Sequence, residues 1–119
     1  IFLFLFSLCI IVHVHGHGVK ISNELKFQKD LNMSCFSADD RIKERTLKPG
    51  THWEFNFGLN VVGNTRYMCT LKQGPGFKHH QSFRAFKRRG LWDWRAREDG
   101  IYLTRKKSEQ PHKEYDWLY

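Results

Sequence analysis

Turn-forming residues recur about every ten positions between residues 48 and 100, and this spacing limits the fold more than any other sequence feature. Each group contains proline, which fixes φ, or glycine and asparagine, which tolerate positive φ. The groups stand at 48–50, 62–64, 74–76, 89–90 and 99–100. Asp99-Gly100 is the strongest β-hairpin pattern among them. Because no helical period long enough for a crossover separates these turns, the sequence predicts an all-β sandwich or barrel of short strands.

Alternation of apolar and polar residues locates strands between the turns. Within 51–57, Trp53, Phe55 and Phe57 share one face, and polar residues share the other. The same period of two predicts further inward-facing side chains at Leu31, Met33, Cys35, Tyr67, Cys69, Leu71, Trp92, Trp94 and Ala96. Tryptophans at this spacing in a small domain are more often core residues than a platform for stacking a sugar or a base. We therefore predict one small antiparallel β-sandwich domain.

Two segments depart from this pattern. Ser37-Ala38-Asp39-Asp40, followed by 41–44, predicts a single capped helical turn. The segment 115–119, which follows Pro111, predicts a closing strand. With 119 residues in total, the chain is too short for a Rossmann fold or a TIM barrel. Most large enzyme architectures are thereby excluded.

The first fourteen residues carry no formal charge, and the first basic residue is Lys20. An apolar run of this length resembles the central region of a signal peptide, and it is short of the roughly 20 residues that a transmembrane helix needs. We predict a signal peptide over 1–16, cleaved after Gly16, and a domain over 17–119. The protein is therefore expected to be secreted and extracellular.

The cysteines predict one disulfide. Cys9 would leave with the signal peptide, so Cys35 and Cys69 would be the only thiols in an oxidising compartment. A bridge between them would close a loop of 33 intervening residues, which the chain-entropy model values at roughly 3 to 4 kcal/mol. The chain has no C-x-x-C motif, which disfavours a zinc site.

Positive charge is concentrated in the second half of the chain. The net charge is +8, and 66–107 holds twelve basic residues against three acidic ones. Such a surface favours acidic partners, although a role in solubility alone explains the positive charge equally well. Nucleic acid is disfavoured because a secreted protein meets cell walls, membranes and receptors first. The candidate partner-binding residues are two trios near turns, Lys87-Arg88-Arg89 and Arg105-Lys106-Lys107.

Catalysis and metal binding find little support in the sequence. His52 and Glu54 could form an acid/base couple, but any solvated strand face produces this spacing. His79-His80 lacks a third ligand and is more typical of a polar loop. No nucleophile elbow or thiol-protease signature is present. We expect no enzymatic activity, no metal, no cofactor and no small-molecule substrate.

Asn32-Met33-Ser34 is a glycosylation sequon. On the predicted strand, Asn32 faces opposite to Leu31 and Cys35, either outward or toward the second face of its sheet. Glycosylation at Asn32 is therefore a prediction, with the empty sequon as the alternative.

Several short motifs follow one another in a fixed order along the chain. They are Ser34-Cys35-Phe36-Ser37-Ala38-Asp39-Asp40, Leu47-x-Pro49-Gly50, Trp53-Glu54-Phe55-Asn56-Phe57, Asn60, Gly63-Asn64-Thr65-Arg66-Tyr67-Met68-Cys69, Trp94, and Glu98-Asp99-Gly100-Ile101-Tyr102. In this order they resemble one plant family, the self-incompatibility S-proteins and their homologues. The resemblance covers nearly all of the predicted domain. It implies a small secreted antiparallel β-sandwich with variable hydrophilic loops. In poppies, members of the family are stigma-side determinants that act through a membrane protein on pollen.

The sequence departs from the family pattern at two places. Many members carry four cysteines, including a Cys-x-Trp pair where this chain has Trp92-Asp93-Trp94. A Cys35–Cys69 bridge and two unpaired thiols therefore both remain open. The poppy-type members tend to have Asp-Leu-Gly where this chain has Arg41-Ile42-Lys43. That loop has a different charge, which suggests a different partner.

These observations predict a secreted signalling ligand. We expect a monomer that a receptor-like plasma-membrane protein on another cell recognises through surface loops. The alternative is a basic defence protein that acts on anionic microbial membranes, favoured by the cationic second half and its interleaved aromatics. Binding of cell-wall polysaccharide is the third hypothesis.

Overall fold

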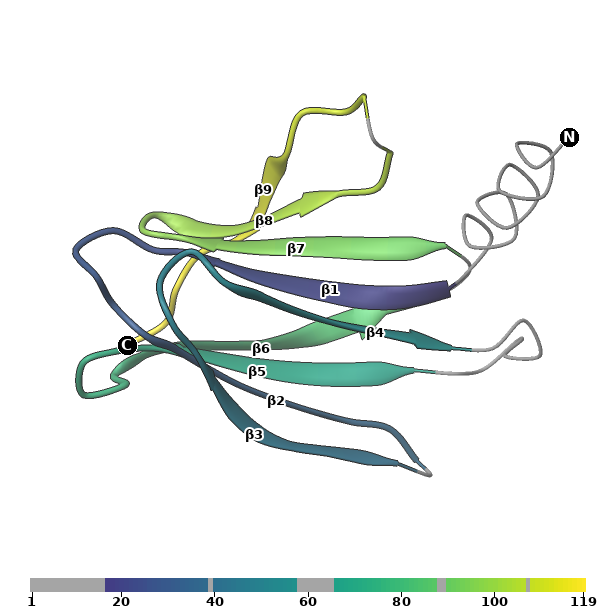
Figure 1. Ribbon diagram of the computed structural model, residues 1–119, viewed down its shortest axis with the longest axis horizontal. Helices are drawn as coiled ribbons and strands as arrows, with labels where there is room; N and C mark the ends of the chain where they lie inside the picture. The colour runs from purple at the N-terminus through teal and green to yellow at the C-terminus, as the bar shows by residue number, and fades with distance from the viewer. Residues whose placement is uncertain (1–16, 39, 58–65, 88–89, 107) are drawn as a thin grey trace, which may run out of the picture.

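In a computed structural model the chain forms two β-sheets stacked face to face (Figure 1). The structure describes residues 17–38, 40–57, 66–87, 90–106 and 108–119. The strands in these ranges are β1 (His17–Glu24), β2 (Leu31–Phe36), β3 (Arg41–Leu47), β4 (His52–Phe57), β5 (Tyr67–Gln73), β6 (His79–Phe86), β7 (Leu91–Arg97), β8 (Gly100–Thr104) and β9 (His112–Tyr115). No helix long and apolar enough to cross a bilayer occurs in the described ranges. The predicted signal peptide, 1–16, lies outside them and stays a prediction.

The strands are divided between a five-stranded sheet, in the order β4-β1-β7-β8-β9, and a four-stranded sheet, in the order β3-β2-β5-β6. The predicted β-sandwich is thus confirmed. Neighbouring strands are antiparallel with one exception among the described pairs, because β1 runs parallel to β7. A parallel pair needs a long connection. Here the intervening chain, from β2 to β6, builds the whole second sheet and also supplies β4, the edge strand beside β1.

The core lies between the sheets and follows the predicted alternation. Along β5, Tyr67, Cys69 and Leu71 are buried, whereas the residues between them are half-exposed. Trp94 is fully buried, and its indole nitrogen donates a hydrogen bond to the backbone oxygen of Ala85, 2.9 Å away in the facing sheet. The remaining buried apolar residues are Val19, Ile21, Leu25, Leu31, Met33, Cys35, Leu47, Phe83, Ala85, Phe86, Trp92, Ala96, Ile101 and Leu103. The tryptophans of β7 are therefore core residues, as predicted.

The two inward-facing cysteines are bonded to each other. Cys35 and Cys69 are direct cross-strand partners on β2 and β5, with a Cα–Cα distance of 4.1 Å. Both are buried. This confirms the predicted disulfide and removes the alternative of two free thiols.

The predicted helical turn after Ser37 is wrong, since β2 and β3 form a hairpin there. The amide of Asp40 donates to Ser37 Oγ at 3.1 Å, and the amide of Ser37 donates to the Asp40 carbonyl at 2.7 Å. The capping side chain therefore closes a tight turn rather than starting a helix. In 41–44, Ile42 alone is half-buried while its neighbours are exposed, which suits an edge strand. Asp39 lies outside the described residues.

The closing strand lies earlier than predicted. β9 ends at Tyr115, where the prediction places the strand's start. Beyond it, Leu118 forms an isolated bridge with His80 of β6, with backbone hydrogen bonds of 2.7 and 2.9 Å. The segment after β9 thus leaves the five-stranded sheet and contacts the other one. Figure 1 shows this yellow segment passing from β9 toward β6.

Most predicted turns are present. Gly50, Gly76 and Gly90 have positive φ in turns or bends, as their positions predict. In the β7–β8 hairpin, Arg97 pairs with Gly100, so Glu98 and Asp99 occupy the turn and Gly100 begins β8. The hairpin is confirmed, with its centre one residue earlier than the Asp-Gly pattern indicates. The turn predicted at 62–64 lies outside the described residues.

Candidate functional site

Two basic segments that are far apart in the sequence meet at one end of the sandwich. Lys87 directly follows β6, and Arg105 directly follows β8. β8 is antiparallel to β7, so the end of β8 lies beside the start of β7, where Trp92 is the second residue. The topology therefore brings both cations to one tryptophan. We call Lys87, Trp92, Arg105 and Lys106 the basic patch.

Cation–π contacts organise this patch. The guanidinium carbon of Arg105 lies 3.6 Å from the centroid of the Trp92 ring, and Lys87 Nζ lies 5.7 Å from the same centroid. Trp92 is only 4% exposed, so the ring belongs to the core while its electron-rich face attracts the cations. One buried aromatic residue thus places two positive charges side by side.

Arg105 is held by further contacts. Its amide donates to Glu109 Oε1 at 2.9 Å, and its Nε donates to the carbonyl of Leu91 at 3.2 Å. Its guanidinium also passes over Gly90, where a Cβ would approach a guanidinium nitrogen to 3.0 Å. Gly90 has a φ of +93°, a conformation that other residues adopt at a cost. A glycine at this bend therefore leaves room for Arg105.

The structure brings together part of the predicted partner-binding set. Lys87 and Arg105 meet at Trp92, and Lys106 is exposed next to them. A depression of about 360 Å³ at this place is lined by Lys87, Trp92, Leu103, Arg105 and Glu114. Arg88, Arg89 and Lys107 lie outside the described residues. The sequence predicts the cations, but the role of Trp92 in joining them follows only from the strand arrangement.

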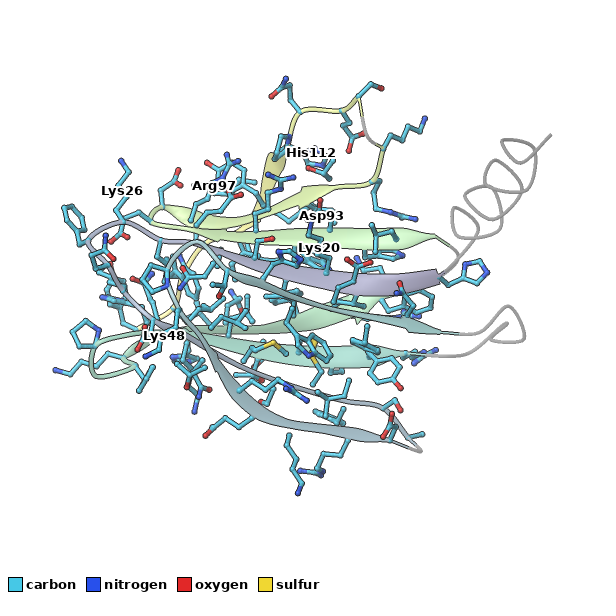
Figure 2. The ribbon with its side chains drawn as sticks, in the orientation of Figure 1. Lys20, Lys26, Lys48, Asp93, Arg97 and His112 are labelled. Atoms are coloured by element: carbon cyan, nitrogen blue, oxygen red, sulfur yellow. A yellow bond between two sulfur atoms is a disulfide. The ribbon has the colours of Figure 1, made fainter. Side chains whose placement is uncertain are left out.

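The other charged surface of the five-stranded sheet is an ion-pair network rather than a site. Glu24 accepts hydrogen bonds from Arg97 Nε at 2.8 Å and from Arg95 Nη1 at 3.1 Å. Figure 2 labels Arg97 and Asp93 on this outer face. Exposed pairs of this kind contribute at most about 1 kcal/mol each. His52 and Glu54 are exposed on β4 at the edge of the same face, as expected for a solvated strand.

The described groups with shifted pKa values lie around the β7–β8 hairpin, away from the basic patch. Burial alone would raise the pKa of Glu98, but hydrogen bonds from the Lys29 ammonium and the Lys26 amide outweigh it and lower the pKa below 4.5. A hydrogen bond to Asp99 raises the pKa of Tyr102, and one to Asp116 raises that of Lys113. Each of these shifts accompanies a fold-stabilising ion pair or hydrogen bond.

The histidines at 79–80 begin β6 and do not form the polar loop that the sequence predicts. The His79 ring packs against Tyr119 with a centroid distance of 4.4 Å, and the bridge to Leu118 extends the pairing of β6. Within the described part of the chain, no cluster of three or more His, Cys, Asp or Glu side chains suits a metal ion.

The sequon asparagine is buried in the four-stranded sheet. Asn32 is 8% exposed and pairs with Thr46 on one side and Lys72 on the other. An N-linked glycan needs room around the side-chain amide. Glycosylation of Asn32 stays a prediction, which the burial of its side chain disfavours.

Comparison with known proteins identifies the family. A family model described as plant self-incompatibility protein S1 matches residues 18–117. The chain belongs to this family. The S-protein homolog 32 of Arabidopsis thaliana is 52% identical over 125 residues, covering 99% of this chain and 96% of the relative. The S-protein homolog 17 of the same plant is 49% identical over 130 residues, with the same coverage of both chains.

A solved structure of a self-incompatibility protein homologue has the same fold. It superimposes with a TM-score of 0.72 at 18% identity, covering 91% of this chain and 99% of the other. That structure is described as representing a widespread family of small, highly stable, secreted proteins from plants. The homologues are thus described as secreted, which agrees with the extracellular location predicted for this chain. The resemblance found in the sequence motifs is therefore confirmed as family membership.

Proposed function

We propose that this self-incompatibility S1 family protein is an extracellular signalling ligand that acts without catalysis. A membrane protein on the surface of another cell recognises it, and the basic patch makes the contact. The observation that carries this proposal is the convergence of two sequence-distant cations on Trp92. Clustered positive charge on a rigid support steers association with acidic partners and selects among them.

The composition of the patch supports a protein partner. Arg105 is fixed by its stacking on Trp92 and by its hydrogen bond to the Leu91 carbonyl. A guanidinium with fixed orientation suits bidentate contact with carboxylates. Acidic loops of a receptor ectodomain present such carboxylates.

The test is capture of the partner by proximity crosslinking on plant cells. We expect the wild-type protein to capture one membrane protein saturably, and the triple variant Lys87→Gln/Arg105→Gln/Lys106→Gln to lose most of this capture at low salt. The matched control, Lys20→Gln/Lys43→Gln/Lys72→Gln, removes the same charge elsewhere on the sheets and should bind like the wild type. Screening by added salt should weaken binding of the wild type.

Three outcomes would contradict the proposal. Equal capture by the triple variant and its control would show that the basic patch takes no part in recognition. Leakage of anionic vesicles without a saturable protein partner would favour the defence function. Capture that resists protease but disappears after wall-degrading enzymes would favour cell-wall polysaccharide.

A further inference from the structure

Two loops lie side by side at the end of the sandwich opposite the basic patch. They are the β1–β2 loop, 25–30, and the β5–β6 loop, 74–78. The amide of Gly74 donates to the carbonyl of Asp30 at 2.9 Å, which ties the loops together. Both line one hollow of about 470 Å³. Figure 1 shows the two loops at the same end, and Figure 2 labels Lys26 and Lys48 there.

Each loop exposes a phenylalanine. Phe27 is 78% exposed and Phe77 is 42% exposed. Both have positive φ, +64° and +56°, as does Gln28 at +55°. Aromatic residues rarely adopt this backbone conformation, and strain of this kind is concentrated at functional sites. The loops therefore present two large apolar side chains to the surroundings instead of burying them.

Lysines accompany both rings. Lys26 precedes Phe27, and Lys78 follows Phe77; both are exposed, and neither forms a salt bridge with a described residue. Lys29 Nζ lies 5.7 Å from the centroid of the Phe27 ring. We call Lys26, Phe27, Phe77 and Lys78 the aromatic end. The two lysines complement negative charge on a partner, and the two phenylalanine rings complement an apolar region of the same partner.

Contacts beneath the surface hold the β1–β2 loop in place. The buried Asn23 amide donates from Nδ2 to the Lys29 carbonyl at 2.9 Å, and its Oδ1 accepts from the Leu25 amide at 3.0 Å. Glu98 accepts from the Lys26 amide at 3.1 Å and forms an ion pair with Lys29. The exposed ring is thus carried on a braced loop, which lowers the ordering cost of binding.

We propose that the aromatic end docks on an anionic lipid bilayer. Phe27 and Phe77 enter the interfacial layer, and Lys26 and Lys78 meet the phosphate level. Apolar side chains combined with basic residues are the features that bind proteins to anionic membrane surfaces. Lysine suits this partner because a compact, hydrated ammonium on a flexible stem contacts head groups without a fixed geometry. This surface is separate from the basic patch, and the inference does not depend on the proposed receptor.

The test is flotation with protein-free phosphatidylcholine vesicles, with and without phosphatidylserine. We expect the wild type to float with the anionic vesicles only, and Phe27→Asn/Phe77→Asn to bind about tenfold more weakly. Asparagine tolerates positive φ and leaves the net charge unchanged. The matched control is Phe36→Asn, since Phe36 is 50% exposed at the other end of the molecule and should be dispensable.

Charge is tested with a second pair of variants. Lys26→Gln/Lys78→Gln should weaken binding to the anionic vesicles more than Lys43→Gln/Lys72→Gln, which removes the same charge from strands β3 and β5 instead of the loops. Thermal unfolding confirms that each variant is folded.

The inference is overturned if the wild type does not float with anionic vesicles, if the double Phe variant floats equally well, or if Phe36→Asn weakens binding as much. Protease-sensitive capture on cells that needs Phe27, without vesicle binding, would assign the aromatic end to a protein groove instead. The vesicles hold no receptor, so a lack of vesicle binding would not bear on the proposed role of the basic patch. Equally, unchanged capture of the patch variants on cells would not bear on vesicle binding.

Discussion

The two ends of the sandwich carry positive charge in different ways. At the basic patch, Arg105 lies against a buried tryptophan and bonds to the backbone, so the cation is part of the folded structure. At the aromatic end, Lys26 and Lys78 are exposed beside exposed rings, and the buried groups support the backbone beneath them. The first arrangement fixes the direction of a charge, which suits a partner with defined acidic groups. The second leaves the charges exposed to solvent, which suits a surface without fixed geometry.

The means of stabilisation also differ between the ends. The disulfide joins β2 and β5 near the end that holds the basic patch, since Cys35 is the penultimate residue of β2. The other end depends on Asn23, which is 1% exposed and joins the β1–β2 loop to the Leu47 carbonyl at 2.9 Å. One end is fastened covalently and the other by buried hydrogen bonds.

The largest effect is expected from removing the covalent link. Cys35→Ala/Cys69→Ala should lower the free energy of unfolding by about 3 to 4 kcal/mol, because the unfolded chain gains the entropy of an open loop. Urea unfolding followed by tryptophan fluorescence measures this change. Reduction of the wild type should reproduce it, and reductant should not affect the variant. A loss below about 1 kcal/mol would show that the bridge is not what stabilises this end.

Removal of the buried amide should have the next largest effect. Asn23→Ala should lower the free energy of unfolding by about 2 to 3 kcal/mol, since it leaves buried carbonyl and amide groups of the loop without partners. The exposed Asn56→Ala on β4 is the control. Chymotrypsin should also cleave after Phe27 faster in the Asn23 variant, because the loop is no longer braced. Unchanged cleavage would show that Asn23 does not stabilise the loop that carries Phe27.

A smaller effect should distinguish the two kinds of cation. Arg105→Gln should cost about 0.5 to 1 kcal/mol of stability, because its contact with Trp92 is lost. Lys26→Gln should cost less, since its exposed side chain makes no close ion pair within the described structure and acts on Glu98 only through its charge. Chemical denaturation of both variants in parallel gives the comparison. Equal losses would contradict the distinction between a cation held by close contacts and an exposed one.

Local patterns predicted the strands that have alternating faces. Leu31, Met33 and Cys35 on β2 point inward as expected, because one buried face forces a period of two. The failure after Ser37 has a local cause, since the same side-chain oxygen that caps a helix also closes a hairpin turn. The strand 17–24 escaped prediction although Val19 and Ile21 alternate, and its parallel pairing with β7 depends on the global topology.

The sites were predictable only in part. Basic trios are visible in the sequence, but their meeting at Trp92 depends on where β6 and β8 end relative to β7. The aromatic end was missed because Phe27 and Phe77 stand next to turn residues, where no period indicates which way a side chain faces. The pairing of adjacent Phe and Lys residues on two neighbouring loops could be recognised only after the loops were placed together.

The smallest effect concerns the pH dependence of the loop support. The pKa of Glu98 is lowered in the folded protein, so its carboxylate stabilises the fold fully above the unfolded value of 4.5. This contribution is lost as the pH falls from 4.5 through the lower folded pKa, because protonation removes the ion pair with Lys29. Unfolding measured between neutral pH and pH 3 should therefore show a steeper loss of stability in the wild type than in Glu98→Gln, whereas the exposed Glu44→Gln should retain the wild-type slope. Parallel profiles for the wild type and Glu98→Gln would mean that the ion pair with Lys29 does not support the β1–β2 loop, and vesicle binding by the aromatic end should then be insensitive to mild acid.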